Sequence, residues 1–166
     1  IPASYSGDAT GELIIKGKSF KDLDIFSLSK ITGTVLQDSD GQFIGLTVGE
    51  DIAFAMENDN VQLNEMKERV IEAAKKVGID SFLNHAPHEL SGGQKQRVSL
   101  AGVMVDNVEI FLFDEPLANL DPASGKKTIE LIDQIYKDTG ATIIIVEHRI
   151  EDVLHRSVDR VVLMGE

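Results

Sequence analysis

The last third of the chain alternates apolar strands with helices, and this alternation constrains the fold more than any other feature. Residues 109–113 and 142–146 are two largely apolar runs, and the second is rich in β-branched side chains. Such a run is typical of a parallel strand that is buried on both faces. Between the two runs, Asp121 precedes Pro122 as a helix N-cap, and Gly140 ends the predicted helix. Strands that alternate with helices in this way predict βαβ units and a mainly parallel sheet.

The middle of the chain contains only helical patterns. Residues 48–57 and 63–77 are predicted helices, and Ser91 and Gln94 have the S-x-x-Q spacing of a capping box that opens a helix to about Val105. In the second helix, six apolar residues share one face, as in an amphipathic helix. They are Leu63, Met66, Val70, Ala73, Ala74 and Val77.

We therefore predict an α/β fold in which a core formed by residues 1–47 and 107–166 is interrupted by a helical subdomain over residues 48–106. The shorter predicted elements are strands over residues 12–16, 31–36 and 160–164, helical turns over 23–30, 81–84 and 150–155, and loops over 1–11 and 37–45.

Composition excludes several classes of function. The 166 residues include 16 basic and 28 acidic side chains, a formal net charge of −12. This charge argues against a nucleic-acid partner, because such binding depends on cationic contacts to phosphates. The absence of cysteine excludes disulfides, thiolate metal sites and thiol catalysis. No apolar stretch approaches the ~18 residues of a membrane span, and no signal peptide is visible, so a cytoplasmic location is expected.

Five short motifs follow one another along the chain. Gln37 closes a predicted strand, Leu90–Gln94 (LSGGQ) opens a helix, and Ile110–Glu115 (IFLFDE) closes a second strand. Ala118–Asp121 (ANLD) then precedes a helix, and His148 closes a third strand.

Two of these motifs have the chemistry of a nucleotide site. Asp114 ends an apolar strand, so its carboxylate is expected at the edge of the sheet where open α/β folds bind nucleotides, and Glu115 follows it directly. Ser91, Gly92 and Gly93 form a helix N-terminus, whose free N–H groups and dipole suit a phosphate. Taken singly, the first motif also fits two solvated carboxylates, and the second also fits an ordinary capping box.

Together, the five motifs resemble the nucleotide-binding domain of an ATP-binding-cassette (ABC) ATPase over nearly the whole chain. They match its Q-loop, signature, Walker B, D-loop and switch histidine in order. The resemblance implies a P-loop-NTPase-type α/β core that binds ATP and Mg²⁺. It assigns Glu115 as the general base for the attacking water, Asp114 and Gln37 as groups that organise Mg²⁺ and water, and His148 as the contact to the γ-phosphate.

The resemblance also implies a dimer. The signature residues Ser91, Gly92, Gly93 and Gln94 would contact the γ-phosphate of an ATP molecule held by a second ABC domain. Asp121 would cross the dimer interface, a role compatible with its N-cap position. Two copies of the chain, or two homologous domains, would sandwich two ATP molecules head to tail.

One expected part of the ABC pattern is absent from the sequence. A Walker A loop has the form G-x-x-x-x-G-K-S/T, and its backbone amides and lysine cradle the phosphates. Neither the lysines at positions 16, 18 and 21 nor the run Gly125–Lys127 has this spacing. The chain is therefore expected to lack the first strands and the P-loop, either because the sequence begins downstream of them or because they were lost. By itself it is expected to be inactive.

Residues 37–43, 46–48 and 51–54, together with the opening residues 1–7, resemble the ATPase subunits of energy-coupling-factor importers, which take up vitamins and metal ions. The family often has Pro where this sequence has Ser39. The predicted function is thus the ATP-hydrolysing subunit of a membrane importer, held at the membrane by a transmembrane partner through the Gln37 loop.

Two alternatives stay open. One is a soluble ABC ATPase of translation or iron–sulfur cluster assembly. DNA-repair and chromosome types are disfavoured, because only 52 residues separate Gln37 from Leu90 and they show no heptad pattern. The other alternative is a degenerate or truncated domain without catalytic activity.

Overall fold

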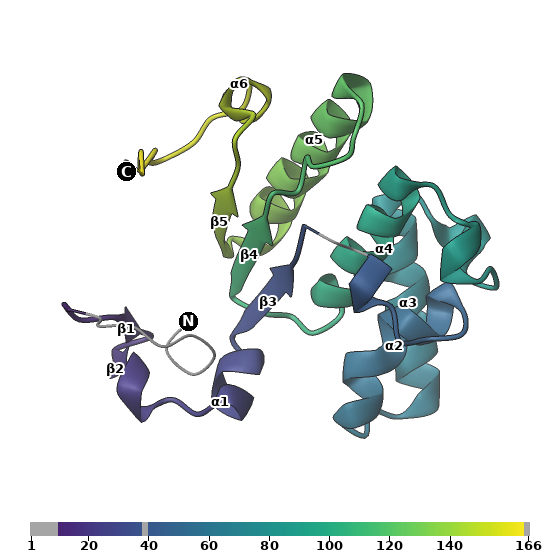
Figure 1. Ribbon diagram of the computed structural model, residues 1–166. Helices are drawn as coiled ribbons and strands as arrows, with labels where there is room; N and C mark the ends of the chain where they lie inside the picture. Colours follow the sequence, from purple (N-terminus) through teal and green to yellow (C-terminus); the bar gives the residue numbers. More distant parts are fainter. Residues whose placement is uncertain (1–9, 38–39, 165–166) are drawn as a thin grey trace.

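A parallel sheet of three strands forms the centre of the computed structural model, which describes residues 10–37 and 40–164. The strands are β3 (Thr32–Val35), β4 (Ile110–Asp114) and β5 (Thr142–Val146), and β4 lies between the other two (Figure 1). The predicted mixed α/β fold with a parallel sheet is confirmed. A separate antiparallel pair, β1 (Ile14–Ile15) and β2 (Lys18–Ser19), lies near the start of the chain.

Three helices between β3 and β4 pack against one another: α2 (Val48–Asn58), α3 (Leu63–Val77) and α4 (Gly92–Met104). A fourth, α5 (Pro122–Thr139), connects β4 to β5. The short helices are α1 (Ile25–Ser29) and α6 (Ile150–Val153), and the 3₁₀ turns are η1 (Phe20–Asp22), η2 (Asp40–Gln42), η3 (Asp80–Phe82) and η4 (Pro87–Glu89). None of the helices within residues 10–37 and 40–164 combines the length and hydropathy that crossing a membrane requires.

Local sequence explains where the long helices begin and end. The Ser91 hydroxyl accepts from the Gln94 amide while the Gln94 side chain accepts from the Ser91 amide, which is the predicted capping box of α4. Thr47 and Glu50 form a second capping box at the start of α2. Gly140 ends α5 with a left-handed φ of 67°, a conformation that glycine adopts without strain.

The core lies on one face of the sheet. Val35, Phe111 and Phe113 are buried on the face that the helices cover, and Ile143 and Ile145 pack against the same core. Gly33 belongs to this face too, and a Cβ atom placed there would lie 3.0 Å from the Val103 side chain. Helix α4 can therefore approach β3 closely only because position 33 has no side chain.

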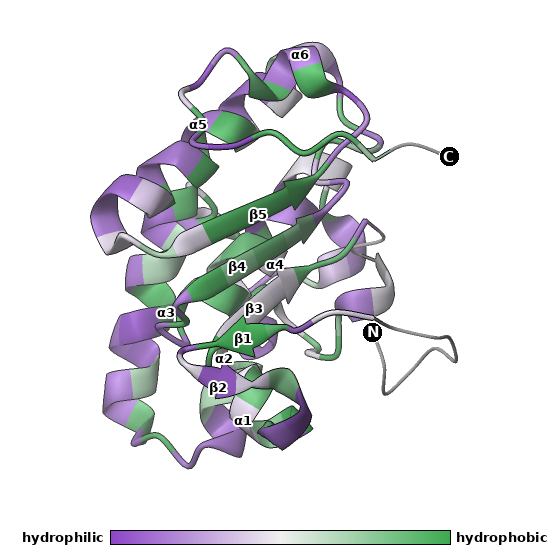
Figure 2. Cartoon of the chain, turned by 90° about the vertical axis from the view of Figure 1, so that its left-hand side faces the viewer, coloured by the Kyte–Doolittle hydropathy of each residue, from purple (hydrophilic) through white to green (hydrophobic). Residues whose placement is uncertain are grey.

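The opposite face of the sheet corrects one expectation. The run Thr142–Val146 forms the predicted parallel strand, but it is not buried on both faces: Thr142, Ile144 and Val146 are exposed. In Figure 2 this face is turned toward the viewer, with apolar residues along β4 and β5 and the long helices α2 to α5 behind the strands. The β-branched composition predicted the strand correctly. Burial of its second face would need a covering layer, which residues 10–37 and 40–164 do not supply.

Residues 160–164 do not form the predicted last strand. Their apolar side chains are exposed, and no described strand pairs with them. A strand needs a neighbour to complete its backbone hydrogen bonds, and sequence pattern alone cannot supply one. Leu63 is a smaller correction, because 61% of its surface is exposed and the buried face of α3 begins at Met66.

The predicted strand over residues 12–16 is also shorter than expected. Only Ile14 and Ile15 pair, and the chain reverses at Lys16 and Gly17, which both have positive φ, at 52° and 75°. Two central residues with positive φ give a type I′ hairpin, so the glycine ends the strand and starts a return strand. The predicted loop over residues 1–11 lies mostly outside the described residues.

We expect Gly33→Ala to lower the free energy of unfolding by about 1–3 kcal/mol, because the new methyl group would lie 3.0 Å from the packed Val103 and Val108 side chains, which would have to shift. Gly102→Ala is the matched control: position 102 lies inside α4, with no atom within 4 Å of the added Cβ. There, alanine should raise the stability by up to ~1 kcal/mol. Urea unfolding of both variants checks the prediction, which fails if they shift in the same direction.

Candidate functional site

The site begins where β4 ends. Asp114 is the last residue of the strand, and the Glu115 amide extends the sheet by donating to the Val146 carbonyl at 2.8 Å. Glu115 has a φ of 48°, in the left-handed region that residues other than glycine rarely adopt. The sheet thus fixes the backbone of Glu115 on one side, and a sharp turn directs the chain away from it on the other.

Three of the predicted site residues meet here. Glu115 Oε2 accepts a hydrogen bond from Gln37 Nε2 at 2.8 Å, and His148 Nε2 lies 3.1 Å from Glu115 Oε1. Gln37 lies two residues beyond the end of β3, and His148 two residues beyond the end of β5. Because β4 lies between these strands, its carboxyl end is the point at which both neighbours can reach one side chain.

The three side chains differ in exposure. The His148 side chain is 84% exposed, whereas that of Glu115 is 26% exposed. Glu115 is therefore partly shielded, and its two contacts come from a neutral amide and an imidazole. A carboxylate offers about four lone-pair sites, so two partners leave it able to accept a further proton or hydrogen bond.

Asp114 lies beside this group but does not join it. Its carboxylate is exposed and makes no hydrogen bond or ion pair with any described residue. Within residues 10–37 and 40–164, no cluster of three or more acidic, histidine or cysteine side chains is arranged to hold a metal ion.

Asp121 begins α5 as predicted. Its Oδ1 accepts from the backbone amides of Ala123 and Ser124 at 3.0 and 3.1 Å, and its Oδ2 accepts from the Ser124 hydroxyl at 2.5 Å. These bonds, that of the Ser124 side chain foremost, hold the pKa of the Asp121 carboxyl below its usual value.

The signature residues lie apart from the Glu115 group. Ser91 and Gln94 bond to each other in the capping box of α4, and no described contact joins them to Gln37, Glu115 or His148. Gly92 is open, with nothing within 4 Å of an added Cβ, and Gly93 faces the Leu120 side chain at 3.8 Å. The exposed N-terminus of α4 is therefore accessible from outside the chain.

Sequence reasoning missed a buried polar link beneath the site. Gln96 on α4 is buried, donates through Nε2 to the Pro116 carbonyl, and accepts from the Thr128 hydroxyl at 3.3 Å. It ties α4 to the loop after Glu115 and to α5. The pattern LSGGQ-Lys-Gln-Arg marked this helix, but nothing in the sequence indicated which of its polar side chains points inward.

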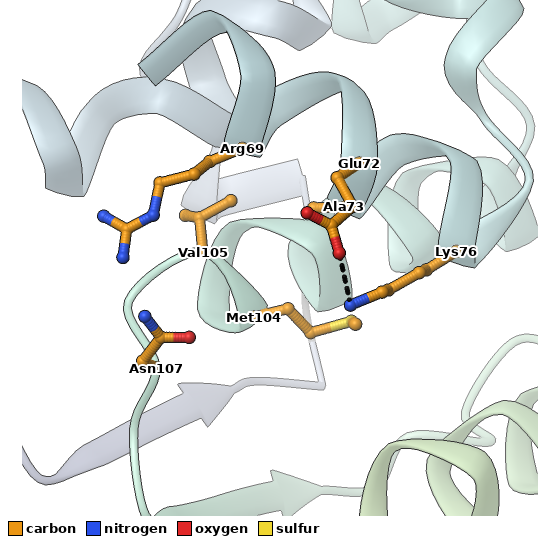
Figure 3. Close-up of a pocket in the computed structure, with 7 residues that line it drawn as sticks. All are labelled: Arg69, Glu72, Ala73, Lys76, Met104, Val105 and Asn107. Atoms are coloured by element: carbon orange, nitrogen blue, oxygen red, sulfur yellow. Dashed lines mark ion pairs between the residues drawn. The ribbon is translucent and has the colours of Figure 1, made fainter. Parts of the chain in front are cut away.

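Two cavities in the described part of the chain lie away from this edge. The pocket in Figure 3 has a volume of about 90 Å³, lies between α3 and the end of α4, and is lined by residues that include Arg69, Lys76 and Asn107. Small-molecule pockets usually begin at about 300 Å³. A second cavity of about 370 Å³ is lined by residues from α5 and from the segment after α6. No predicted site residue lines either one.

Comparison with known proteins identifies the family. The sequence model described as ABC transporter matches residues 3–118. The chain belongs to the ABC transporter family. A putative ABC transporter ATP-binding protein of Photobacterium profundum is 59% identical over all 166 residues, although the chain spans only 29% of the length of that relative.

Solved ABC structures agree with this assignment. The cbiO1 protein of Clostridium perfringens, described as part of the ABC transporter complex cbiONQ, has a TM-score of 0.80 and 34% identity, with 87% of this chain and 59% of that one covered. The ATP-binding cassette MJ0796, a dimer in a post-hydrolysis state with ADP and Pi, has a TM-score of 0.74 and 30% identity, with 87% and 65% covered.

The residues at this edge fit a Mg²⁺–nucleotide. Mg²⁺ commonly keeps several waters and uses one or two carboxylates together with substrate phosphates, rather than a cage of protein ligands. The exposed carboxylate of Asp114, which has no partner among the described residues, and the Gln37 amide beyond the end of β3 would be such donors. The Walker A sequence that the ABC pattern requires is not among the 166 residues. Ser39 and residues 1–7, which carried the resemblance to energy-coupling-factor subunits, lie outside the described residues.

The lowered pKa of Asp121 predicts a pH effect on stability. Because this carboxyl has a lower pKa in the folded state than in the unfolded chain, its contribution is present above about pH 4 and is lost as the pH falls through the folded-state value. Asp121→Asn keeps a capping oxygen but does not titrate. The difference between the thermal midpoints of the two proteins should therefore shrink from about pH 5 to pH 2. A difference that stays constant with pH would contradict the assignment.

The Gln96 link predicts a stability loss. Gln96→Leu removes the partners of the Pro116 carbonyl and the Thr128 hydroxyl, so we expect the free energy of unfolding to fall by about 2 kcal/mol or more. Gln134→Leu, on the exposed face of α5, is the control and should change it by less than ~0.5 kcal/mol. Adding Thr128→Val to Gln96→Leu should cost less than the sum of the single changes. Additive losses would show that the two side chains do not interact.

Proposed function

We propose that this chain forms part of an ATP-hydrolysing subunit of an ABC transporter, with Glu115 as the general base. The observation that carries the proposal is the meeting of Gln37, Glu115 and His148 at the carboxyl end of β4. In open α/β sheets, this edge is where nucleotides bind. Family membership favours ATP over other ligands for this edge.

In the proposed mechanism, Glu115 accepts the proton of the attacking water. Its carboxylate is held from two sides, by the Gln37 amide and the His148 imidazole, so it is oriented before the reaction begins. His148 is exposed and can turn its imidazole from Glu115 toward the terminal phosphate. Gln37 orients the water through its amide.

Asp114 and Gln37 would hold the Mg²⁺ ion, in part through bound water. The ion supplies charge stabilisation of the phosphate oxygens when it is bound. Asp114 suits this role because its carboxylate is exposed and has no partner among the described residues.

The signature residues would act on a second ABC domain. Ser91, Gly92, Gly93 and Gln94 present an accessible helix N-terminus that makes no described contact with the Glu115 group of its own chain. Asp121, exposed at the start of α5, would lie at the same interface. The MJ0796 relative is described as a dimer, which supports a head-to-tail pair, formed either by two copies or by two homologous domains.

The transport role rests on the loop after Gln37. Ile44 and Leu46 are exposed there, Leu46 over 82% of its surface, and they would contact a transmembrane partner at the cytoplasmic face of a membrane. The description of cbiO1 as part of the cbiONQ transporter complex supports such a partner, and the energy-coupling-factor resemblance favours import of vitamins or metal ions. Residues 48–106 would then form a helical subdomain that moves with the partner.

The missing Walker A sequence keeps a second possibility, a chain that binds no nucleotide by itself. Calorimetric titration with ATP and Mg²⁺, on this chain and on one extended upstream through the expected P-loop, separates the two cases. Binding by the extended form alone supports the proposed function for the longer protein. Binding by neither form favours a degenerate domain, and binding by both requires a phosphate site that we have not identified.

For the form that hydrolyses ATP, we expect Glu115→Gln to reduce kcat by about 10²-fold or more while leaving ATP binding intact, because the amide keeps the shape but cannot accept a proton. Steady-state hydrolysis and calorimetric binding measure the two effects. Glu57→Gln, an exposed change on α2, should leave both unchanged. Hydrolysis by Glu115→Gln at the control rate would show that Glu115 is not the base.

A further inference from the structure

The residues on either side of His148 bind the loop that follows Glu115. The Glu147 carboxylate accepts three backbone hydrogen bonds: its Oε2 accepts from the Leu117 amide at 3.1 Å, and its Oε1 accepts from the amides of His148 and Arg149 at 2.9 and 3.0 Å. One half-buried side chain thus joins the loop after β4 to the loop after β5.

Arg149 joins the same two loops, but it donates hydrogen bonds where Glu147 accepts them. Its Nη1 donates to the carbonyls of Leu117 and Leu120 at 3.0 and 2.9 Å. Its Nε and Nη2 bind Asp152 Oδ2 at 2.8 and 2.6 Å, which fixes the guanidinium plane. Leu117 is fully buried. Its backbone N–H is therefore bound by Glu147 and its carbonyl by Arg149, the two neighbours of His148.

This arrangement matters because His148 has little packing of its own. Its side chain is 84% exposed, and its described contact is with Glu115. The place of the imidazole therefore depends on its backbone, and the amide of His148 is itself held by Glu147. Misplacement of a reacting group by about 1 Å can cost about 10²-fold in rate.

We propose that Glu147 and Arg149 are positioning residues that hold the His148 and Glu115 loops in one fixed relation. The proposal rests on the function proposed above. A purely local role, in which Glu147 only fixes the turn that precedes α6, would explain its bonds to the amides of His148 and Arg149. It would not explain the bond to Leu117, which lies 30 residues away in sequence.

The kinetic test compares Glu147→Gln with Glu151→Gln in the natural full-length protein. The first replaces one accepting oxygen by an N–H donor that faces a backbone N–H, and the second removes the same charge from an exposed position on α6. We expect Glu147→Gln to lower kcat by about 10- to 100-fold, with KM for ATP changed less than about twofold. Glu151→Gln should behave as the wild type.

Arg149→Lys is the second variant. Lysine keeps the charge but cannot bind two carbonyls and Asp152 at once, so kcat should fall less than in Glu147→Gln, again with KM unchanged. Arg160→Lys, at an exposed position, is its control. The melting curve of each variant gives its folded fraction at the assay temperature. If kcat falls only in proportion to that fraction, the two residues have a structural role and the proposal is overturned. If Glu147→Gln does not fold, Arg149→Lys decides the question.

Hydrogen exchange provides a readout that does not depend on activity. In Glu147→Gln, peptides that cover residues 115–121 and 146–150 should both exchange faster than in the wild type. Faster exchange in residues 146–153 alone would indicate a local role in the turn before α6 and overturn the proposal.

The two proposals can fail separately. If the wild type hydrolyses ATP, Glu115→Gln does not, and Glu147→Gln retains full kcat, only the positioning role is wrong. If the wild type does not hydrolyse ATP, the proposed function is wrong and the positioning role falls with it, even where the exchange result shows the two loops to be joined.

Discussion

Parallel pairing of β4 with a strand on each side is the constraint on which the rest of the structure depends. The register pairs Val35 with Phe113 and Asp114 with Val146, so the three strands end at nearly the same level. Side chains just beyond these ends then reach a common point without any long excursion of the backbone. The same pairing places Phe111 and Phe113 against the helices and turns the exposed side chains of β5 away from them.

Much of this arrangement was predictable because it is specified by short stretches of sequence. Capping residues predicted the start of α4 at Ser91 and of α5 at Asp121, and Gly140 predicted the end of α5. The alternation of strands and helices predicted the parallel sheet, and the ordered motifs predicted the family. The roles assigned to the site residues stay predictions, although the side chains of Gln37 and His148 both contact Glu115.

What could not be predicted depends on partners that are distant in sequence. The amphipathic or β-branched character of a segment does not reveal whether another layer covers it, so the burial of β5 and the strand over residues 160–164 were predicted wrongly. The buried Gln96 bonds to residues 20 and 32 positions away. Glu147 lies between Val146, the end of a predicted strand, and the predicted site residue His148. Only the fold shows that its carboxylate accepts from the Leu117 amide.

The left-handed backbone of Glu115 limits how this site can change in evolution. At a φ of 48°, β-branched residues such as Val, Ile and Thr are strongly disfavoured, whereas Asn, Asp and Gly are tolerated. A lineage that loses the carboxylate is therefore steered away from β-branched replacements at this position. Because the loop after this turn also binds Glu147 through the Leu117 amide, a replacement that keeps the turn would keep the shape of the site after its chemistry is lost.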